Sequence, residues 1–307
     1  MGCGVIDLAV VILTYNEERH LGRALASVVG IASEIFVIDS FSKDATLDIA
    51  REAGAVVLQH PFVNQARQFQ WAMDNAPITA GWIMRLDADE IIEPDLAARI
   101  ADELPKLDAG VVGINLWRKH IFMGRWIRHG GRYPLVLLRI FRRGQGQIED
   151  RWMDEHILVE GGSTVTFQGG FSDHSLTDLT YFTDKHNKYA TREALDVLSK
   201  RHGLAGETAG ISADSTSRHS AVKRLIKERI YNRLPFWLGP LAYFLYRYFL
   251  QLGFLDGKPG LIYHFLQGFW YRFLVGAKLE ELEAALAAYP TPQGKKAELA
   301  RLTGVKL

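Results

Sequence analysis

Two aspartates, Asp87 and Asp89, stand one residue apart directly after the apolar run Trp82-Ile83-Met84 and the step Arg85-Leu86. Two carboxylates at the end of a buried strand offer hard oxygen ligands. Mg²⁺ or Mn²⁺ is commonly bound through one or two such carboxylates, together with water and substrate phosphates. The pattern therefore predicts a divalent-cation site that serves a nucleotide diphosphate. Because an Asp-x-Asp pair is also typical of a solvated turn or a helix cap, the prediction depends on the surrounding chain.

Two further polar clusters follow apolar runs in the same way. Residues 8–13 are continuously apolar, as expected of a parallel strand covered on both faces, and they end at Thr14-Tyr15-Asn16-Glu17. Residues 35–38 form a second run that ends at Asp39. Ligands of open α/β sheets bind beyond the carboxyl ends of the strands. We therefore expect these polar clusters and the aspartate pair to converge on one edge of a sheet.

The alternation of elements predicts the fold class. Strands are expected at 8–13, 35–38, 55–58 and 82–86, and helices are expected from Leu21, at 46–53 and at 65–73. Such alternation indicates an α/β fold with a doubly wound, mostly parallel sheet. Because the chain has no G-x-G-x-x-G and no G-x-x-x-x-G-K-[ST], a dinucleotide fingerprint and a P-loop are excluded.

Four motifs in order resemble the inverting glycosyltransferase family 2, whose members have the GT-A nucleotide-diphospho-sugar transferase fold. They are Thr14-Tyr15-Asn16-Glu17, Asp39-Ser40 with Asp44 and Thr46, Asn64-Gln65-Ala66-Arg67, and Asp87-Ala88-Asp89-Glu90, within roughly the first 175 residues. The resemblance implies a metal-dependent enzyme that uses a nucleotide sugar as donor.

The resemblance also implies roles for individual residues. Those expected to hold the base and ribose of the donor are Thr14, Tyr15, Asn16, Glu17 and Asp39. Gln65 and Arg67 would lie near the nucleotide or the diphosphate, Asp89 would be the better metal ligand, and Asp87 would contact ribose or metal. One departure matters, because the second motif of the family often reads Asp-Asp-Gly-Ser and here reads Asp39-Ser40-Phe41-Ser42. The ribose contact of the second acid is therefore missing or is made by Ser40.

An inverting transfer needs a general base to take the proton of the acceptor hydroxyl, and a carboxylate is the usual choice. The bound metal stabilises the departing diphosphate as a Lewis acid. Residues 152–161 resemble the His-Glu segment of bacterial members that decorate lipopolysaccharide cores, with Asp154 in place of the histidine. This register makes Glu155 the base and Asp154 its neighbour, whereas an alternative register makes Asp154 the base. A solvated acidic turn is the third interpretation.

Two other residues have weaker signals. His174 follows a strand expected at 165–171 and is either a ligand of the metal or diphosphate or a structural histidine. Arg139 belongs to an apolar strand expected at 135–141. It is expected either to face acceptor phosphates or to lie at a solvated strand end.

The C-terminal third is basic and aromatic. From residue 218 to residue 278 there are ten Lys and Arg residues against two acidic residues, and fifteen aromatic residues lie between Tyr231 and Phe273. Aromatic side chains gather at the headgroup level of membranes, and basic residues meet anionic lipid. We expect a catalytic domain at 1–202 (donor half to about residue 90, acceptor half at 91–202), a mobile loop at 203–217 and a membrane-associating helical appendage at 218–307.

Within this appendage, two apolar stretches at 235–255 and 261–277 flank a turn expected at 256–260. The first approaches the length of about 20 residues that spans a bilayer, but Arg247 near its middle is costly there. The sequence thus predicts a helical hairpin that lies in one leaflet. A buried helical subdomain or an oligomer interface is the alternative.

Composition bounds the remaining possibilities. The 36 Lys and Arg residues balance 35 acidic residues, which gives no nucleic-acid signature. The single cysteine forms no internal disulfide, which is consistent with a reducing compartment. No secretory leader is evident at the N-terminus, so we expect a peripheral or monotopic enzyme on the cytoplasmic face of the inner membrane.

The sequence therefore predicts an inverting glycosyltransferase that uses Mg²⁺ or Mn²⁺. It would transfer a hexose, for example glucose from UDP-glucose, to a membrane-embedded saccharide such as lipopolysaccharide core. One alternative keeps the fold and makes polyprenyl phosphate the acceptor. An alternative of another class is a non-catalytic membrane scaffold that binds sugar nucleotides.

Overall fold

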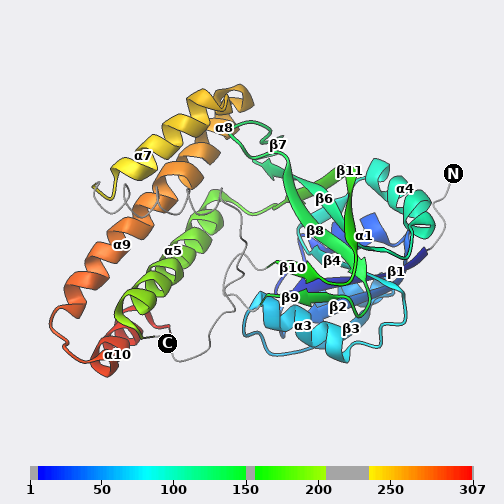
Figure 1. Cartoon of the computed structure of the whole chain (residues 1–307), viewed down its shortest axis with the longest axis horizontal. Helices are drawn as coiled ribbons and strands as arrows, with labels where there is room; N and C mark the ends of the chain where they lie inside the picture. The colour runs from blue at the N-terminus through cyan, green and yellow to red at the C-terminus, as the bar shows by residue number, and fades with distance from the viewer. Residues whose placement is uncertain (1–5, 150–155, 205–234, 306–307) are drawn as a thin grey trace. The chain divides into compact units, whose positions relative to one another are not determined.

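The computed structural model describes residues 6–149, 156–204 and 235–305. The chain forms two compact units. The first runs to Arg128 and from Arg132 to Leu176, and the second comprises His129–Gly131 and the chain from Thr177 onward (Figure 1). The boundary that we predicted after residue 202 differs from this division, because helix α5 (Leu179–His202) packs on helix α9 (Tyr271–Leu286) of the second unit.

The first unit is built around a mixed sheet of nine strands. Its order is β3 (Val56–Gln59), β2 (Ala32–Asp39), β1 (Ile6–Thr14), β4 (Trp82–Asp87), β8 (Leu135–Arg142), β6 (Val111–Phe122), β11 (Ser163–His174) and β5 (Glu90–Ile92), with β7 (Arg125–Trp126) paired to β6. The strands up to β4 pair in parallel, as predicted. Strand β8 is antiparallel to both β4 and β6.

The expectation of a mostly parallel sheet is therefore wrong for the second half of this unit. Strands β6, β7 and β8 follow one another through short connections, which permit antiparallel pairing, whereas a parallel pair needs a longer crossover. Strand β11 returns parallel to β6, and β5 pairs antiparallel with β11 along the outer edge.

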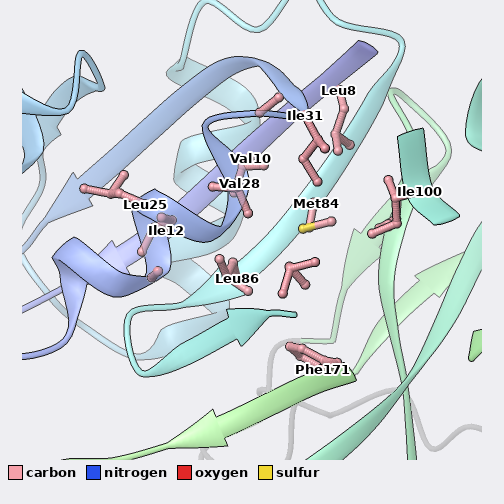
Figure 2. Packing of buried hydrophobic residues seen from close by; sticks show 14 of the residues in the cluster. Leu8, Val10, Ile12, Leu25, Val28, Ile31, Met84, Leu86, Ile100 and Phe171 are labelled. Carbon is pink, nitrogen blue, oxygen red and sulfur yellow. The ribbon is translucent and has the colours of Figure 1, made fainter. Parts of the chain in front are cut away.

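Strand β1 is buried on both faces, as its continuous apolar run predicted. Leu8, Val10 and Ile12 pack with helix α1 (Leu21–Val28) and helix α4 (Pro94–Glu103) on one face. Figure 2 shows Val10 beside Val28 and Ile12 beside Leu25. Ala9 and Val11 face the opposite side, toward helix α3 (Gln65–Asn75). Helix α2 (Thr46–Glu52) and the short helix η1 (Leu104–Lys106) complete this unit.

The register of the parallel strands brings the predicted polar clusters to one edge. Thr14 lies opposite Asp39 in the β1–β2 pair, and Leu13 lies opposite Asp87 in the β1–β4 pair. The convergence expected from the three strand ends is thereby confirmed. A separate two-stranded sheet, β9 (Gly146–Ile148) with β10 (Ile157–Val159), adjoins β8 and α3.

The described part of the second unit is helical. After α5 it contains α7 (Leu238–Leu245), the π-helical turn η2 (Tyr246–Leu250), η3 (Gly253–Asp256), α8 (Gly257–His264), the π-helical turn η4 (Phe265–Trp270), α9 and α10 (Pro292–Thr303). Asp178 caps α5 by accepting the backbone N–H of Tyr181 at 2.8 Å, and Gly203 ends it in the left-handed conformation. Ala194, Leu198, Leu282 and Leu286 form the core between α5 and α9.

The helical hairpin predicted for residues 235–277 is present, but its turn is displaced. Residues 256–260 were expected to form the turn, whereas α8 begins at Gly257 and the chain reverses before it, around η3. In the described residues, we find no helix that combines the length and the apolar character needed to cross a membrane. The first residues of the predicted appendage, 218–234, lie outside the described residues.

Candidate active site

The loops that follow β1 and β2 are joined by reciprocal hydrogen bonds. The backbone N–H of Asn16 donates to Oγ of Ser42 at 2.8 Å, and the N–H of Lys43 donates to Oδ1 of Asn16 at 2.8 Å. One residue later, the N–H of Glu17 donates to Oγ1 of Thr46 at 2.8 Å. These bonds fix the first and second motifs to each other. The two motifs therefore form one rigid corner at the edge of the sheet.

Asp39 is the fully buried centre of this corner. Its carboxylate accepts hydrogen bonds from Oγ1 of Thr14 at 3.1 Å, the N–H of Ser42 at 2.9 Å and Nε2 of Gln59 at 3.1 Å. Buried carboxylates need such donors, since an unsatisfied charge is costly in a dry environment. Asp39 thus organises the corner from within, while Tyr15 and Phe41 remain exposed on its surface.

Two residues of the corner have a left-handed backbone without being glycine. The φ of Asn16 is 56° and that of Phe41 is 62°. Asparagine tolerates this conformation because its side chain bonds to the nearby backbone, as Asn16 does here, but phenylalanine has no such compensation. Phe41 occupies the position where the related motif often has glycine. The corner therefore stores backbone strain at Phe41.

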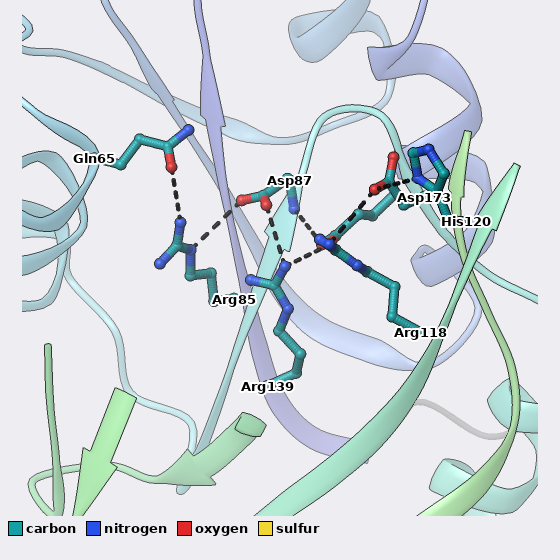
Figure 3. A network of polar contacts seen from close by, with 8 residues as sticks. Gln65, Arg85, Asp87, Arg118, His120, Arg139 and Asp173 are labelled. Atoms are coloured by element: carbon teal, nitrogen blue, oxygen red, sulfur yellow. Dashed lines mark hydrogen bonds and ion pairs between the residues drawn. The ribbon is translucent and has the colours of Figure 1, made fainter. Parts of the chain in front are cut away.

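The aspartate pair lies at the end of β4, where a buried network of charges holds its first member. Nη2 of Arg139 lies 3.1 Å from Oδ2 of Asp87, and Nε of Arg85 lies 3.5 Å from Oδ1 (Figure 3). Arg139 also donates to Glu90, whose side chain is 1% exposed and accepts the backbone N–H of Asp87 at 2.9 Å. Arg139 is therefore neither a solvated strand end nor a ligand for acceptor phosphates, and both sequence interpretations of this residue were wrong.

The same network continues toward β11. Nη1 of Arg118 lies 3.3 Å from Oε1 of Glu90, and Nη2 of Arg118 lies 3.7 Å from Oδ2 of Asp173. The ring Nδ1 of His120 lies 3.1 Å from the same oxygen of Asp173 (Figure 3). Strands β4, β8, β6 and β11 thus each contribute charged residues to one interior cluster.

The network shifts the pKa values of its carboxyl groups in opposite directions. Burial alone would raise the pKa of Asp87, but the charges of Arg139, Arg85 and Arg118 outweigh it and lower the pKa to about 2. Burial and the charge of Asp87 raise the pKa of Glu90, despite Arg139. For Asp173, the hydrogen bond and charge of His120 outweigh burial, so its pKa lies well below the ordinary value.

Asp89 lies beside a second arrangement that involves His174 and Arg23. The backbone N–H of His174 donates to the carbonyl oxygen of Asp89 at 2.9 Å. Arg23 of α1 donates through Nη2 to the carbonyl of His174 at 2.8 Å, and its Nη1 lies 3.3 Å from Nδ1 of the ring. This arrangement fixes the end of β11 next to the second aspartate.

The contact with Arg23 sets the tautomer of His174. Burial and the charge of Arg23 lower the pKa of His174, which favours the neutral ring near pH 7. A guanidinium only donates, so Nδ1 is the acceptor and Nε2 carries the proton. His174 therefore presents an N–H donor suited to a phosphate oxygen. Metal ligation through Nε2 would first require loss of that proton or of the contact with Arg23.

Comparison with known proteins places the first unit in a family. The model of the family described as "Glycosyl transferase family 2" matches residues 9–169, which is more than half of the 307 residues. The chain belongs to glycosyl transferase family 2. It is accordingly a glycosyltransferase, and its first unit is a GT-A-like α/β domain with a mixed sheet. This membership sets aside the non-catalytic scaffold considered from the sequence.

Two relatives of this glycosyltransferase are uncharacterized glycosyltransferases of Rickettsia species. An uncharacterized glycosyltransferase of Rickettsia typhi is 24% identical over 291 residues, which cover 90% of this chain and 87% of the relative. An uncharacterized glycosyltransferase of Rickettsia felis is 34% identical over 97 residues, or 32% of each chain.

Solved structures show a more distant similarity. One is glucosyl-3-phosphoglycerate synthase of Mycobacterium tuberculosis in complex with Mn²⁺, uridine diphosphate and glucosyl-3-phosphoglycerate. It matches with a TM-score of 0.41 and 15% identity, over 65% of this chain and 81% of that one. Mannosyl-3-phosphoglycerate synthase of Rubrobacter xylanophilus matches with a TM-score of 0.40 and 12% identity, over 67% and 77% of the two chains.

The donor set of the glycosyltransferase fits a hard divalent cation bound through few protein ligands. The two oxygens of Asp87 lie near Arg139 and Arg85, and the half-buried Asp89 follows one residue later, so both carboxylates stand at the end of β4. Within the described ranges, no group of three or more His, Cys, Asp or Glu residues is arranged to hold a metal ion. Mg²⁺ and Mn²⁺ commonly complete a shell of few carboxylates with water and diphosphate oxygens.

The other predicted donor residues lie around this edge. The third motif begins α3, where Asn64 caps the helix by accepting the N–H of Arg67 at 2.7 Å. Oε1 of the exposed Gln65 lies 3.4 Å from Nη2 of Arg85, which links this helix to Asp87 (Figure 3). Ser40 accepts from Nε2 of Gln68 at 3.2 Å, so its hydroxyl is used within the protein. Arg67 is exposed near the helix start.

Glu17 has a structural partner that the sequence did not reveal. Its Oε2 lies 2.6 Å from Nδ1 of the buried His20, and Nε2 of that ring accepts the N–H of Leu176 at 2.9 Å. The first motif is thus tied to the segment after β11. The predicted bases, Asp154 and Glu155, lie outside the described residues.

Sequence reasoning missed Arg23 and Arg118 and misjudged Arg139. A signal for two of them was present, because Arg118 and Arg139 interrupt strands that are otherwise rich in apolar residues. A buried arginine requires a carboxylate partner, and Glu90 directly follows the aspartate pair. Arg23 has no comparable signal, since it occupies an ordinary position in a short amphipathic helix.

Proposed function

We propose that this family 2 enzyme is a metal-dependent, inverting glycosyltransferase that transfers a hexose from a nucleotide sugar to a membrane-embedded saccharide. The observation that carries the proposal is the position of Asp89. It lies at the end of β4, on the same sheet edge as the rigid corner formed by the first two motifs. A nucleotide diphosphate placed across this edge would meet the corner with its base and ribose, and Asp89 with its phosphates.

Different residues would carry out the separate steps of the proposed reaction. Tyr15 is exposed at the corner and would contact the nucleotide, and the N–H at Nε2 of His174 would donate to the diphosphate. A metal at Asp89 would supply Lewis-acid stabilisation of the departing diphosphate. Glu155 would take the proton of the acceptor hydroxyl, with Asp154 as its neighbour. The alternative register exchanges these two roles.

The acceptor class is proposed from the second unit, which is rich in exposed aromatic residues between Phe236 and Phe265. Lipopolysaccharide core is the acceptor favoured by the resemblance of residues 152–161, and glucose from UDP-glucose is the corresponding donor. The proposed site of action is the cytoplasmic face of the inner membrane. Polyprenyl phosphate is the rival acceptor, and its nucleophile is already anionic, so transfer to it needs no general base.

The decisive experiment measures release of nucleoside diphosphate from a panel of nucleotide sugars. Purified full-length protein in detergent receives Mg²⁺ or Mn²⁺ and an extract of bacterial lipid and lipopolysaccharide. We expect release that the extract stimulates and that Asp89→Ala abolishes. Asp48→Ala, which removes a carboxylate of the exposed Asp48–Arg51 pair on α2, is the matched control and should retain activity. Release that is unaffected by Asp89→Ala would refute the metal assignment.

The two acceptors are separated by the amide variants. With a saccharide acceptor, Glu155→Gln should reduce transfer by about 100-fold or more, because a general base contributes roughly 10²–10⁴ in rate. Donor binding should remain unchanged. If Asp154→Asn has this effect instead, the alternative register is correct. If the double variant retains most activity with polyprenyl phosphate, the acceptor is the phosphate lipid.

A further inference from the structure

The hairpin of the second unit exposes apolar side chains at its tip, which we define as residues 246–255. Six of these residues are exposed large apolar side chains: Tyr246, Phe249, Leu250, Leu252, Phe254 and Leu255. Leu250 is 75% exposed, and Leu252 has a left-handed backbone with φ 60°. Single exposed apolar residues are ordinary on protein surfaces, but a dense group marks an interaction site.

The tip continues into an aromatic strip of rings in mutual contact. The ring of Tyr248 lies 5.1 Å from that of Phe249 and 5.5 Å from that of Phe244, between ring centroids. From Phe244 the contacts pass to Phe265 at 6.0 Å and then along one face of the helix to Phe269 and Phe273, each step below 6 Å. These contacts join the exposed rings of Phe249 and Phe265 to four half-buried rings, along α7, η2, η4 and the start of α9.

The charged residue of the tip, Arg247, and the next residue after the tip, Asp256, are turned inward. Arg247 is 7% exposed and donates through Nε to the carbonyl of Gly130 at 2.7 Å. Asp256 is 2% exposed and accepts from the N–H of His129 at 2.9 Å and from its ring at 2.7 Å. These bonds anchor the hairpin to the 129–131 loop of the same unit. The tip therefore holds its polar groups inside and its apolar side chains outside, which is the reverse of an ordinary water-exposed turn.

The charges that remain on the surface of this hairpin are positive. Asp256 is the single acidic residue of the sequence between Pro235 and Leu279. Lys258 at the start of α8 and Arg272 are exposed, and the guanidinium of Arg272 lies 4.4 Å from the centre of the Tyr243 ring. An apolar and aromatic surface with a purely basic rim is complementary to anionic lipid headgroups above acyl chains. A symmetric contact between two copies would instead bring two positive rims together.

We propose that the tip and the aromatic strip are a docking surface for an anionic phospholipid bilayer. Phe249, Leu250 and Phe254 enter the headgroup and upper acyl region, and Lys258 and Arg272 contact lipid phosphates. The inference rests on the proposed function for its purpose, since docking would bring the enzyme to a membrane-embedded acceptor. Its physical basis lies in the hairpin alone.

The test measures binding of the full-length protein to vesicles by flotation. The vesicles contain phosphatidylcholine alone or a mixture of phosphatidylcholine and phosphatidylglycerol. We expect binding to the anionic vesicles that weakens as salt is added, because headgroup attraction is screened. The variant Phe249→Ser with Leu250→Ser should bind these vesicles at least roughly tenfold more weakly, since two apolar side chains no longer leave water. The variant Lys258→Glu should reduce the preference for anionic vesicles.

The matched control is Val136→Ser with Leu158→Ser, two comparably exposed apolar residues of the first unit, which should bind like wild type. Circular dichroism and the thermal midpoint establish that each variant is folded, and Leu250→Ser alone provides a milder change at the most exposed position. Equal vesicle binding by wild type and the tip variants would overturn the proposal. So would a concentration-dependent dimer that the tip variants abolish, because it would identify a second copy as the occupant.

The outcome is distinguishable from failure of the proposed function. If the wild-type protein does not bind vesicles but still releases nucleoside diphosphate in a metal-dependent way, the docking surface is rejected and the transferase is kept. Vesicle binding without use of any nucleotide sugar would reject the proposed reaction and keep the docking surface.

Discussion

Nη2 of Arg139 lies 3.1 Å from Oδ2 of Asp87 and also donates to Glu90, so one buried guanidinium holds two carboxylates beneath the candidate metal site. The first aspartate of the motif is therefore positioned by the protein before any ligand arrives. Such preorganisation favours binding of a charged ligand without movement of these side chains, because the arginines already compensate the charges of the carboxylates. It also makes the site dependent on residues far from it in sequence.

The first prediction concerns removal of this guanidinium. Arg139→Gln should reduce the free energy of unfolding by about 3–5 kcal/mol, because it leaves the buried carboxylate of Glu90 without its main partner and removes one of the two arginines at the half-buried Asp87. Urea unfolding followed by circular dichroism measures the change. Arg51→Gln, which breaks the exposed Arg51–Asp48 pair on α2, should cost less than about 1 kcal/mol and serves as the control. A cost for Arg139→Gln as small as the control would show that the network is not structural.

The second prediction concerns the dependence of stability on pH. Asp87 and Asp173 have pKa values below their ordinary range, with Asp87 at about 2. Between roughly pH 2 and pH 4 the unfolded chain binds more protons than the native protein, so stability should rise with pH across this window. The pKa of Glu90 is raised by burial, so its contribution has the opposite sign and is lost as pH rises through that pKa.

Urea unfolding across this range, in the presence of a chelator, tests the second prediction. Asp173→Asn should flatten the rise below pH 4, and Glu90→Gln should remove the opposing contribution at higher pH. If the free energy of unfolding of Asp173→Asn depends on pH below pH 4 as it does in wild type, other carboxyl groups control acid unfolding.

Much of the donor edge was predictable because strand periodicity and strand ends are local signals. The apolar run at 8–13 predicted a strand buried on both faces, and the parallel register brought Thr14 opposite Asp39 as expected. The second half of the sheet was not predictable in this way. The antiparallel placement of β8 between β4 and β6 depends on contacts between segments far apart in the chain, which no local pattern records.

The same distinction applies to the site residues. Asp87 and Asp89 were visible as a motif, whereas Arg139, which contacts Asp87, lies on strand β8, 52 positions further along the chain. Arg23 is separated from His174 by 151 positions, so their contact exists only in the folded protein. The motif thus indicated a candidate metal site, and the fold determined which side chains surround Asp87 and which tautomer of His174 the contact with Arg23 favours.

The third prediction concerns the strained backbone at Phe41, where φ is 62°. Phe41→Gly should raise the free energy of unfolding by about 1 kcal/mol, because a left-handed residue with a Cβ costs roughly 1–2 kcal/mol and glycine does not pay this cost. Phe41→Ala keeps the Cβ and should give no such gain, which makes it the control for loss of the exposed ring. Thermal and urea unfolding measure both variants. If both variants change the free energy of unfolding by a similar amount, loss of the phenylalanine ring, rather than relief of backbone strain, causes the change.

The last prediction tests Arg23 as a positioning residue. Its guanidinium donates to the carbonyl and ring of His174, whose backbone N–H in turn contacts the carbonyl of Asp89. Outer partners of a metal site typically change affinity or activity by about 10–100-fold, so Arg23→Gln should weaken apparent Mn²⁺ affinity by about tenfold or more. Titration of donor turnover with Mn²⁺ measures this effect.

A purely structural role for Arg23 makes a different prediction. Arg23 is only half-buried, so Arg23→Gln should change the free energy of unfolding by no more than about 1 kcal/mol. Arg23→Lys keeps the charge but cannot bond to both groups of His174, and it should recover little of the lost affinity because lysine has no planar fork of donors. Full recovery by lysine would mean that charge near Asp89, and not the position of His174, is what Arg23 contributes.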